Sequence, residues 1–214
     1  MQKKLLIVIL LLFFQACTHA GDTDLQVRTC DFHKERAENN EIISSYLLGM
    51  CYRFGQGRKQ DIQQAVYWFN KASEQDYLPA TESLNTIYLL EPEYKDRASN
   101  AVDALQELLE KDYGRAGVVL ARAYHEGKGV IKNDAEAIIF LEKAARLNVP
   151  QAIAGMYYVH HLGLLGESAD KKKADLWLSL LDRYGKKYSI LKETGNEYLL
   201  RFKESHFREM MGMK

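Results

Sequence analysis

The sequence predicts an all-α protein, a right-handed α-solenoid of stacked antiparallel helix pairs. The main observation is that residue types recur every 36 positions through most of the chain. The recurring positions are Tyr52, Tyr88 and Tyr124; Ala65, Ala101 and Ala137; Ala80, Ala116 and Ala152; Gly55 and Gly127; Gly57 and Gly129; Lys71 and Lys143; and Ala72 and Ala144. A fixed period of this size is typical of repeat proteins, in which each unit buries its apolar face only against its neighbours.

Composition excludes one broad class of partner. The 214 residues include 29 basic and 29 acidic side chains, so there is no general excess of positive charge. A near-neutral domain lacks the electrostatic footprint of a nucleic-acid-binding protein. We therefore expect no nucleic acid among its partners.

Residues 1–20 have the pattern of a secretory signal peptide. A basic start precedes an unbroken apolar run over residues 5–14, which is too short to span a bilayer, and small residues follow it. Residues 14–17 resemble the lipobox of bacterial lipoproteins, which implies cleavage before Cys17. Cleavage after Ala20 is the alternative and would release a soluble periplasmic protein.

The lipobox resemblance implies a diacylated Cys17 that anchors the protein to a membrane. Thr18 follows the cysteine where an aspartate would favour retention in the inner membrane. The expected location is therefore the periplasmic face of the outer membrane.

Residues 21–41 are expected to pack on the first repeat. Export makes a disulfide between Cys30 and Cys51 possible, because the compartment would be oxidising. Closing this loop would stabilise the fold by about 3 kcal/mol. The alternative is two unpaired thiols, with Cys51 acting as a small apolar residue inside a helix.

The repeat unit contains two helices. In the first copy, apolar residues at helical spacing predict helix A over residues 42–54, and Gly55 ends it because glycine adopts the left-handed conformation without a side-chain clash. Asp61 then has the position of an N-cap for helix B, as Asn133 does in the third copy. Small residues at the helix crossing let the two backbones approach closely.

These residues resemble the Sel-1-like repeat. The first copy has Gly49, Tyr52, Gly55 and Gly57, then Asp61, Ala65, Trp68 and Ala72; the third has Tyr124, Gly127 and Gly129, then Ala137 and Ala144. The glycine loop and the 36-residue period separate this motif from the tetratricopeptide repeat. The resemblance implies four repeats within residues 42–184, approximately 42–77, 78–113, 114–149 and 150–185.

Two copies depart from the motif. In the second, residues 90–93 replace the glycine loop; the fourth has His160 in the tyrosine position and one extra residue before Trp177. Trp68 and Trp177 have equivalent repeat positions and are predicted to be core residues. Residues 186–214 are expected to form a helical region that caps the open end of the stack.

Candidate recognition residues are those that vary between copies on helix A, since the repeated positions are committed to packing. Arg53, Arg122, His125 and His161 belong to this class. We expect no metal site, because the chain has no CxxC motif and adjacent histidines at 160 and 161 point about 100° apart on a helix. No cofactor motif is present either.

Catalytic motifs are weak. Ser168-x-x-Lys171 and Ser189-x-x-Lys192 match one element of penicillin-recognising enzymes, but the companion elements are missing. We therefore expect a non-enzymatic protein whose concave surface binds another protein.

The family resemblance implies a more specific function. Small Sel-1-like lipoproteins often act as immunity proteins that neutralise secreted effectors, such as phospholipases delivered by type VI secretion. An envelope scaffold or regulatory adaptor is the alternative. A β-lactamase-like enzyme or cell-wall hydrolase is a third, less favoured reading.

Overall fold

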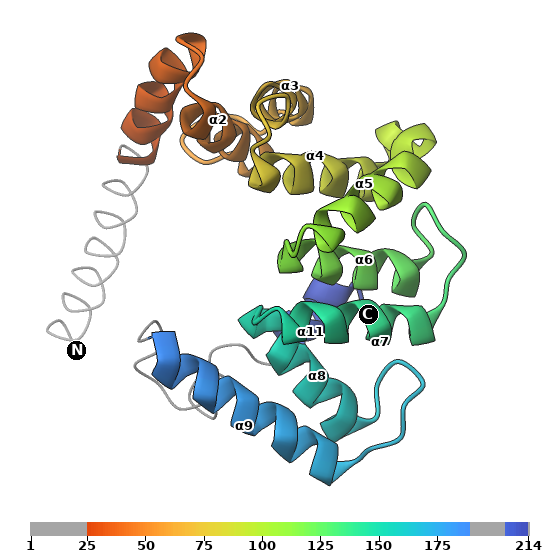
Figure 1. The fold of residues 1–214 in the computed structure, drawn as a ribbon. Coiled ribbons are helices and arrows are strands. Elements are labelled where there is room, and N and C mark those ends of the chain that lie inside the picture. The colour runs from red at the N-terminus through yellow and green to blue at the C-terminus, as the bar shows by residue number, and fades with distance from the viewer. Residues whose placement is uncertain (1–24, 189–203, 214) are drawn as a thin grey trace, which may run out of the picture. The chain divides into compact units, whose positions relative to one another are not determined.

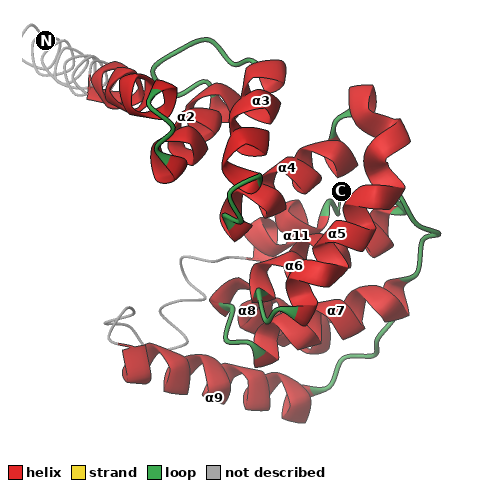
Figure 2. Cartoon of the chain, turned by 45° about the horizontal axis from the view of Figure 1, so that its top comes forward, coloured by secondary structure: helices red, strands yellow, loops and turns green. Residues whose placement is uncertain are grey.

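The computed structural model describes residues 25–188 and 204–213, which form helices joined by loops, without a strand among them (Figures 1 and 2). The chain separates into two units, residues 1–84 and 85–214. The expected signal peptide, Cys17 and most of the expected C-terminal cap lie outside the described residues. The all-α repeat architecture predicted from the 36-residue period is confirmed.

The first unit contains a helix over residues 25–38, then α2 (Ile42–Phe54) and α3 (Ile62–Ser73). α2 and α3 form the first antiparallel pair, with the completely buried Ala65 and Ala72 on α3. Gly49 shows how close the two helices are, because a Cβ atom there would lie 2.6 Å from the Phe69 ring. The small residues of the motif therefore allow the helices to approach, as predicted.

The boundary between the two units falls within α4 (Leu78–Leu90). The second unit continues with the short 3₁₀ helix η1 (Pro92–Arg97) and the helices α5 (Ala98–Glu110), α6 (Gly114–Glu126), α7 (Asp134–Arg146), α8 (Pro150–Leu162), α9 (Lys171–Tyr188) and α11 (Glu204–Met211). Successive helices from α5 to α9 pack against one another. Helix A of the third and fourth copies is α6 and α8, and helix B is α7 and α9.

The turn from helix A to helix B is the same in three copies. Each helix A ends at a glycine with positive φ: Gly55, Gly127 and Gly163. The backbone N–H of the residue that starts the next helix then donates to the carbonyl of the residue at the tyrosine position. These pairs are Asp61 to Tyr52 (2.9 Å), Asn133 to Tyr124 (2.8 Å) and Asp170 to His160 (2.7 Å). The extra residue of the fourth copy is therefore accommodated within the loop, and His160 keeps the tyrosine position.

The N-caps of helix B also match the prediction. The Asp61 carboxylate accepts a hydrogen bond from the backbone N–H of Gln64, and the Asn133 side chain accepts from Ala135 and Glu136. Asp170 caps α9 in the same way by accepting from Lys172 and Lys173. These bonds satisfy backbone donors that have no partner inside the helix.

A second periodic feature lies in the turn from helix B to the next helix A. Asn40, Asp76, Asp112 and Asn148 have φ between 57° and 64°, and they recur at the repeat period. Asparagine and aspartate tolerate the left-handed conformation better than other residues with a side chain. In each turn the next residue donates to a carbonyl five positions earlier, as Tyr77 does to Ala72.

This second series shows that the helix over residues 25–38 has the register of a helix B. It precedes Asn40 as α3 precedes Asp76. The contact of this helix with the glycine turn after α2 also repeats along the chain. A Cβ atom on Gly57 would lie 2.5 Å from the backbone of Gln26, and one on Gly129 would clash with the backbone of Ala98, 72 residues further along. The expected N-terminal segment therefore contains a helix B that comes before the first complete helix pair.

The second copy lacks the glycine turn, as its sequence indicated. Pro92 starts η1, which leads directly into α5. Arg97 donates a hydrogen bond to the Tyr88 hydroxyl over 2.9 Å, and its guanidinium lies over the Tyr88 ring. The tyrosine position of this copy therefore keeps a polar partner despite the different loop.

Helix α11 packs on α6 and α8 within the second unit, near the label C in Figure 1. Its buried residues are Phe207 and Met211, and the Phe207 ring fits against Gly155 on α8. The expected cap over the last helix pair stays a prediction, because most of residues 186–214 lie outside the described part of the chain. The described part of the C-terminal region covers the faces of two A helices.

None of the helices within the described ranges combines the length and apolar character needed to cross a bilayer.

Candidate functional site

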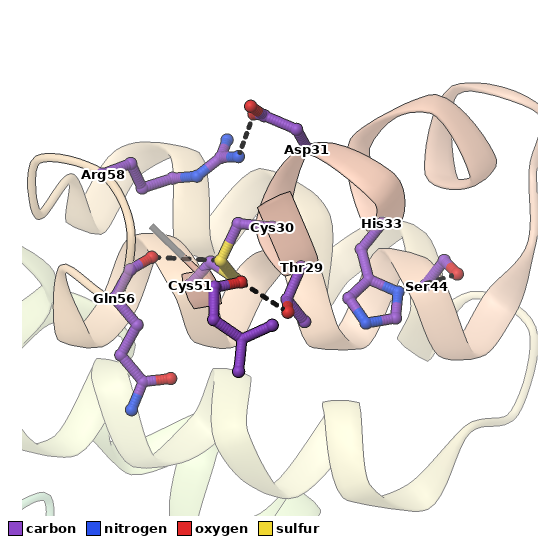
Figure 3. The surroundings of a disulfide bond; sticks show 9 residues. Thr29, Cys30, Asp31, His33, Ser44, Cys51, Gln56 and Arg58 are labelled. Atoms are coloured by element: carbon purple, nitrogen blue, oxygen red, sulfur yellow. Dashed lines mark hydrogen bonds and ion pairs between the residues drawn. A yellow bond between two sulfur atoms is a disulfide. The ribbon is translucent and has the colours of Figure 1, made fainter. Parts of the chain in front are cut away.

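Cys30 and Cys51 form a disulfide bond that joins the helix over residues 25–38 to α2 (Figure 3). Cys30 is buried, and its Sγ lies 3.0 Å from the carbonyl oxygen of Gln56. Nearby, Arg58 donates to Asp31 over 3.1 Å, which adds a polar link between the same helix and the glycine turn. The disulfide therefore covalently fixes this N-terminal helix to the first complete repeat.

The four predicted recognition residues all have partners within the chain. Arg122 bonds Glu126 over 3.0 Å, and His125 bonds Asp134 over 2.6 Å. His161 stacks on Tyr157, with ring centroids 5.0 Å apart, and the Arg53 guanidinium lies over the Phe54 ring. Arg53 belongs to the first unit and the other three residues to the second.

The larger candidate site is a pocket of about 520 Å³ in the second unit, a volume typical of ligand sites. It lies between the two B helices α7 and α9, with α8 beneath them. Its apolar walls include Ile138, Met156, Trp177 and Leu180, and Leu176 at its edge is 69% exposed. Trp177 is only partly buried, which differs from the expectation that it is a core residue like Trp68.

His160 lines this pocket and is its least satisfied polar group. Its side chain is only 8% exposed, and Nδ1 has no hydrogen-bond partner among the described residues. The nearest carboxylate oxygen, Oε2 of Glu167, is 4.0 Å away, too far for a hydrogen bond. Buried polar groups in native proteins are nearly always bonded, so His160 is an exception; its Nδ1 has almost no accessible surface and faces the interior.

Burial and neighbouring charges set the protonation of His160. Desolvation lowers the pKa of His160 below its ordinary value of 6.5, and the Lys173 ammonium lowers it further. The carboxylates of Glu167, Asp170 and Glu142 act in the opposite direction but are the weaker influence. The imidazole is therefore neutral at pH 7, with one nitrogen that donates and one that accepts.

The charges around the pocket largely pair with one another. Arg146 donates to Glu142 over 2.6 Å, and the Lys173 ammonium lies 4.0 Å from Glu167. Arg183 is the remaining charged residue of the lining. The pocket therefore offers apolar walls, one buried polar nitrogen and a nearly neutral rim.

Sequence reasoning placed His160 in the tyrosine position but did not select it as a site residue. The available signal was that it alone breaks a tyrosine series of three preceding copies. The sequence could not show that the substitution faces a hollow, because the packing of α7 and α9 around it is tertiary information.

Two other sequence candidates have simpler surroundings. Ser168 is exposed in the loop before α9, and Lys171 is exposed at its start. Ser189 and Lys192 lie outside the described residues. No group of three or more potential metal ligands occurs within residues 25–188 and 204–213.

Comparisons with known proteins agree with this architecture. The family model of the Sel1 repeat matches residues 42–77 and 118–149. An uncharacterized protein of Neisseria meningitidis serogroup B is 30% identical over 163 residues, which are 76% of this chain and 33% of that protein. The chain thus spans about a third of the length of this relative.

Two solved structures are also similar. A Sel1 repeat protein from Oxalobacter formigenes has a TM-score of 0.62 at 22% identity, with 72% of this chain and 62% of that chain covered. A protective antigen of uropathogenic Escherichia coli, which displays an SLR fold, has a TM-score of 0.56 at 25% identity, with coverage of 86% and 40%. The first of these likenesses bears on the fold alone.

Proposed function

This chain is a Sel1-repeat protein, and we propose that it acts in the bacterial envelope as a binding protein that neutralises a secreted effector. Sel1 repeats are protein–protein interaction modules and generally non-enzymatic scaffolds. The more specific proposal is an immunity-type inhibitor, with an effector such as a type VI phospholipase as its partner. A lipid on Cys17 would hold it on the periplasmic face of the outer membrane.

The observation that carries the binding proposal is the pocket around His160. It combines apolar walls, an exposed leucine and a buried nitrogen without a partner among the described residues. Such a surface gains apolar burial when a partner covers it. The Cys30–Cys51 disulfide supports the envelope location, because structural disulfides persist in oxidising compartments.

The inhibitor proposal is tested with the purified protein and the effector whose gene lies nearest to the gene of this protein. We expect a stable complex of fixed stoichiometry and loss of effector activity when the two are mixed in equal amounts. Deleting the gene should make cells sensitive to that effector. If a pull-down with the protein recovers only resident envelope proteins, and the deletion strain survives the effector as well as the wild type does, the protein is a scaffold or adaptor instead.

The anchor is tested by replacing Cys17. Cys17→Ala should move the protein from the membrane fraction to the soluble periplasmic fraction, because the thiol that carries the lipid is lost. Mass spectrometry of the wild-type N-terminus should show a diacylated cysteine. A wild-type protein cleaved after Ala20 and free of lipid would contradict the anchor while leaving the binding proposal intact.

A further inference from the structure

Helix α11 covers a surface made of A helices. It packs on α6 and α8, the A helices of the third and fourth copies, and we call their common surface the A-helix face. Phe207 and Met211 of α11 are completely buried, four residues apart on one side of the helix. The Phe207 ring lies 2.7 Å from the position that a Cβ atom on Gly155 would take, and its centroid is 6.0 Å from that of Tyr158. α11 is therefore an amphipathic helix bound to the A-helix face by its apolar side.

An apolar hollow adjoins α11 on this face. Its volume is about 170 Å³, close to that of a cavity that holds benzene. Met210 of α11 contributes to its lining, and the other walls come from α4 and α6. They include Leu89, Leu90, Val118, Val119 and Arg122. α11 therefore covers only part of the apolar surface, and the hollow has room for one more large side chain.

α11 depends on packing for its helical conformation. It has eight residues, and isolated helices shorter than about 12 residues are marginal in water. Its apolar contacts come from Phe207, Met210 and Met211, with Met213 just after the helix. Methionine side chains are unbranched and adaptable, which suits a contact that forms and breaks. A longer helix with the same apolar spacing can therefore replace α11 and bury more surface.

We propose that the A-helix face binds an amphipathic helix of the partner protein, and that α11 occupies this site in the free protein as an autoinhibitory contact. The partner helix carries large apolar residues at positions i and i+4, which match Phe207 and Met211, and it extends into the hollow beside Met210. Filling the hollow adds apolar burial that α11 lacks, so the partner helix displaces α11. A strand does not match this spacing, because its side chains on one face repeat every two residues.

The A-helix face is a second binding surface, separate from the pocket around His160. Different residues line the pocket and the hollow. Arg122, one of the predicted recognition residues, lines the hollow beside α11. The proposal goes beyond the function proposed above, because it sets a condition for binding that applies to an effector and to a resident envelope protein alike.

The test uses the full chain and a peptide of known sequence, so it needs no identified partner. Phe207→Asp places a charge at a completely buried position and should release α11 from the A-helix face. The probe is a fluorescein-labelled peptide of residues 204–213, stapled between the exposed positions 205 and 209 to hold it helical. Fluorescence anisotropy should show saturable binding to the variant. The wild type should bind the peptide about a hundredfold more weakly, because tethered α11 competes at a high effective concentration.

Matched controls assign the effect to the apolar contact. Arg208→Ala changes the same helix at a partly exposed position and should bind the peptide as weakly as the wild type does. A peptide in which alanine replaces Phe207 should not bind the Phe207→Asp protein. Circular dichroism checks that each variant is folded.

Hydrogen exchange of the wild type gives a readout that needs no variant. The backbone amides of α11 should exchange together and faster than those of α6 and α8, because α11 leaves the A-helix face without unfolding the second unit. Exchange of α11 as slow as that of α6 and α8 would make it a fixed part of the core and would overturn the proposal.

Three further results would overturn it. The first is equal affinity of the peptide for the wild type and for Phe207→Asp, and the second is no binding to the folded variant. The third is a dimeric wild type that becomes monomeric on Phe207→Asp, which would identify the occupant as α11 of a second copy. None of these results depends on the effector assay, and failure of that assay would not alter them.

Discussion

Gly57 and Gly166 both have left-handed backbone, with φ of 65° and 80°, but only Gly57 lies against another segment. A Cβ atom on Gly57 would lie 2.5 Å from the carbonyl of Gln26, whereas nothing lies within 4 Å of one on Gly166. The two positions therefore separate the cost of backbone conformation from the cost of a steric clash.

Replacing each glycine by alanine tests this difference. Gly166→Ala should lower the free energy of unfolding by about 1 kcal/mol, the cost of left-handed backbone with a side chain. Gly57→Ala should lower it by about 2 kcal/mol more, because the helix over residues 25–38 must shift. Urea denaturation measures both. Equal losses would show that the close approach at Gly57 does not affect the free energy of unfolding.

His160 provides a second test at the residue scale, through its lowered pKa. In the unfolded chain the imidazole binds a proton near pH 6.5, whereas burial and Lys173 make the folded state bind it less readily. Between these two pKa values the unfolded chain carries more protons, so the free energy of unfolding falls as pH decreases below about 6.5.

His160→Phe should remove this contribution. The stability of the variant should fall less than that of the wild type between pH 7.5 and pH 5, as measured by chemical denaturation at each pH. Parallel curves for His160→Phe and the wild type would mean that the pKa of His160 does not change on folding.

At the scale of single elements, α11 has an unusual place. A C-terminal helix that capped the stack would cover the last pair, but α11 lies on α6 and α8. Phe207 is completely buried, with its ring 6.0 Å from that of Tyr158 and against Gly155. The apolar core of the second unit therefore includes side chains from the end of the chain.

Phe207→Ala should lower the free energy of unfolding of the second unit by about 3–5 kcal/mol, because it leaves a cavity between α8 and α11. Arg208→Ala on the same helix removes only the ion pair with Glu204 and should cost less than about 1 kcal/mol. Denaturant titration of both variants gives the comparison. If they cost the same, the packing of α11 does not stabilise the unit.

At the scale of the whole molecule, the chain comprises two units, and the disulfide lies entirely in the first. Repeat proteins lose cooperativity when their coupling is weak, so the two units can unfold in separate transitions. A disulfide that closes a 21-residue separation should stabilise its own unit by about 3 kcal/mol.

Calorimetry with and without a reductant tests this. Reduction should lower the melting temperature of the first unit and leave that of the second unchanged. The double variant Cys30→Ser/Cys51→Ser should match the reduced wild type and should not respond to reductant. A reductant effect on both transitions would show that the stability of the second unit depends on the first.

Much of the fold could be predicted from the sequence because the repeat period is local information. Helix A and helix B of the first copy, the left-handed Gly55 and the N-cap Asp61 all depend on residues within a few positions of one another. The same period includes the series Asn40, Asp76, Asp112 and Asn148, which places a helix B before the first complete pair.

The candidate site could not be predicted in the same way. Arg53, Arg122, His125 and His161 were selected because they vary between copies, yet each has a partner in its own chain. A residue type that differs between copies marks a position that the repeat packing does not require. It does not show which side chains lie next to that position in the folded protein. The pocket depends on how α7, α8 and α9 pack around His160.

The helical repeat, the glycine turns and the replacement of tyrosine by His160 can all be predicted from the sequence, because they follow from short-range backbone preferences and from a fixed period. The burial of His160 beside a hollow and the packing of α11 on α6 and α8 are visible only in the folded chain. Both depend on side chains far apart in the chain, and packing between such groups is decided by shape and volume, which no spacing in the sequence records.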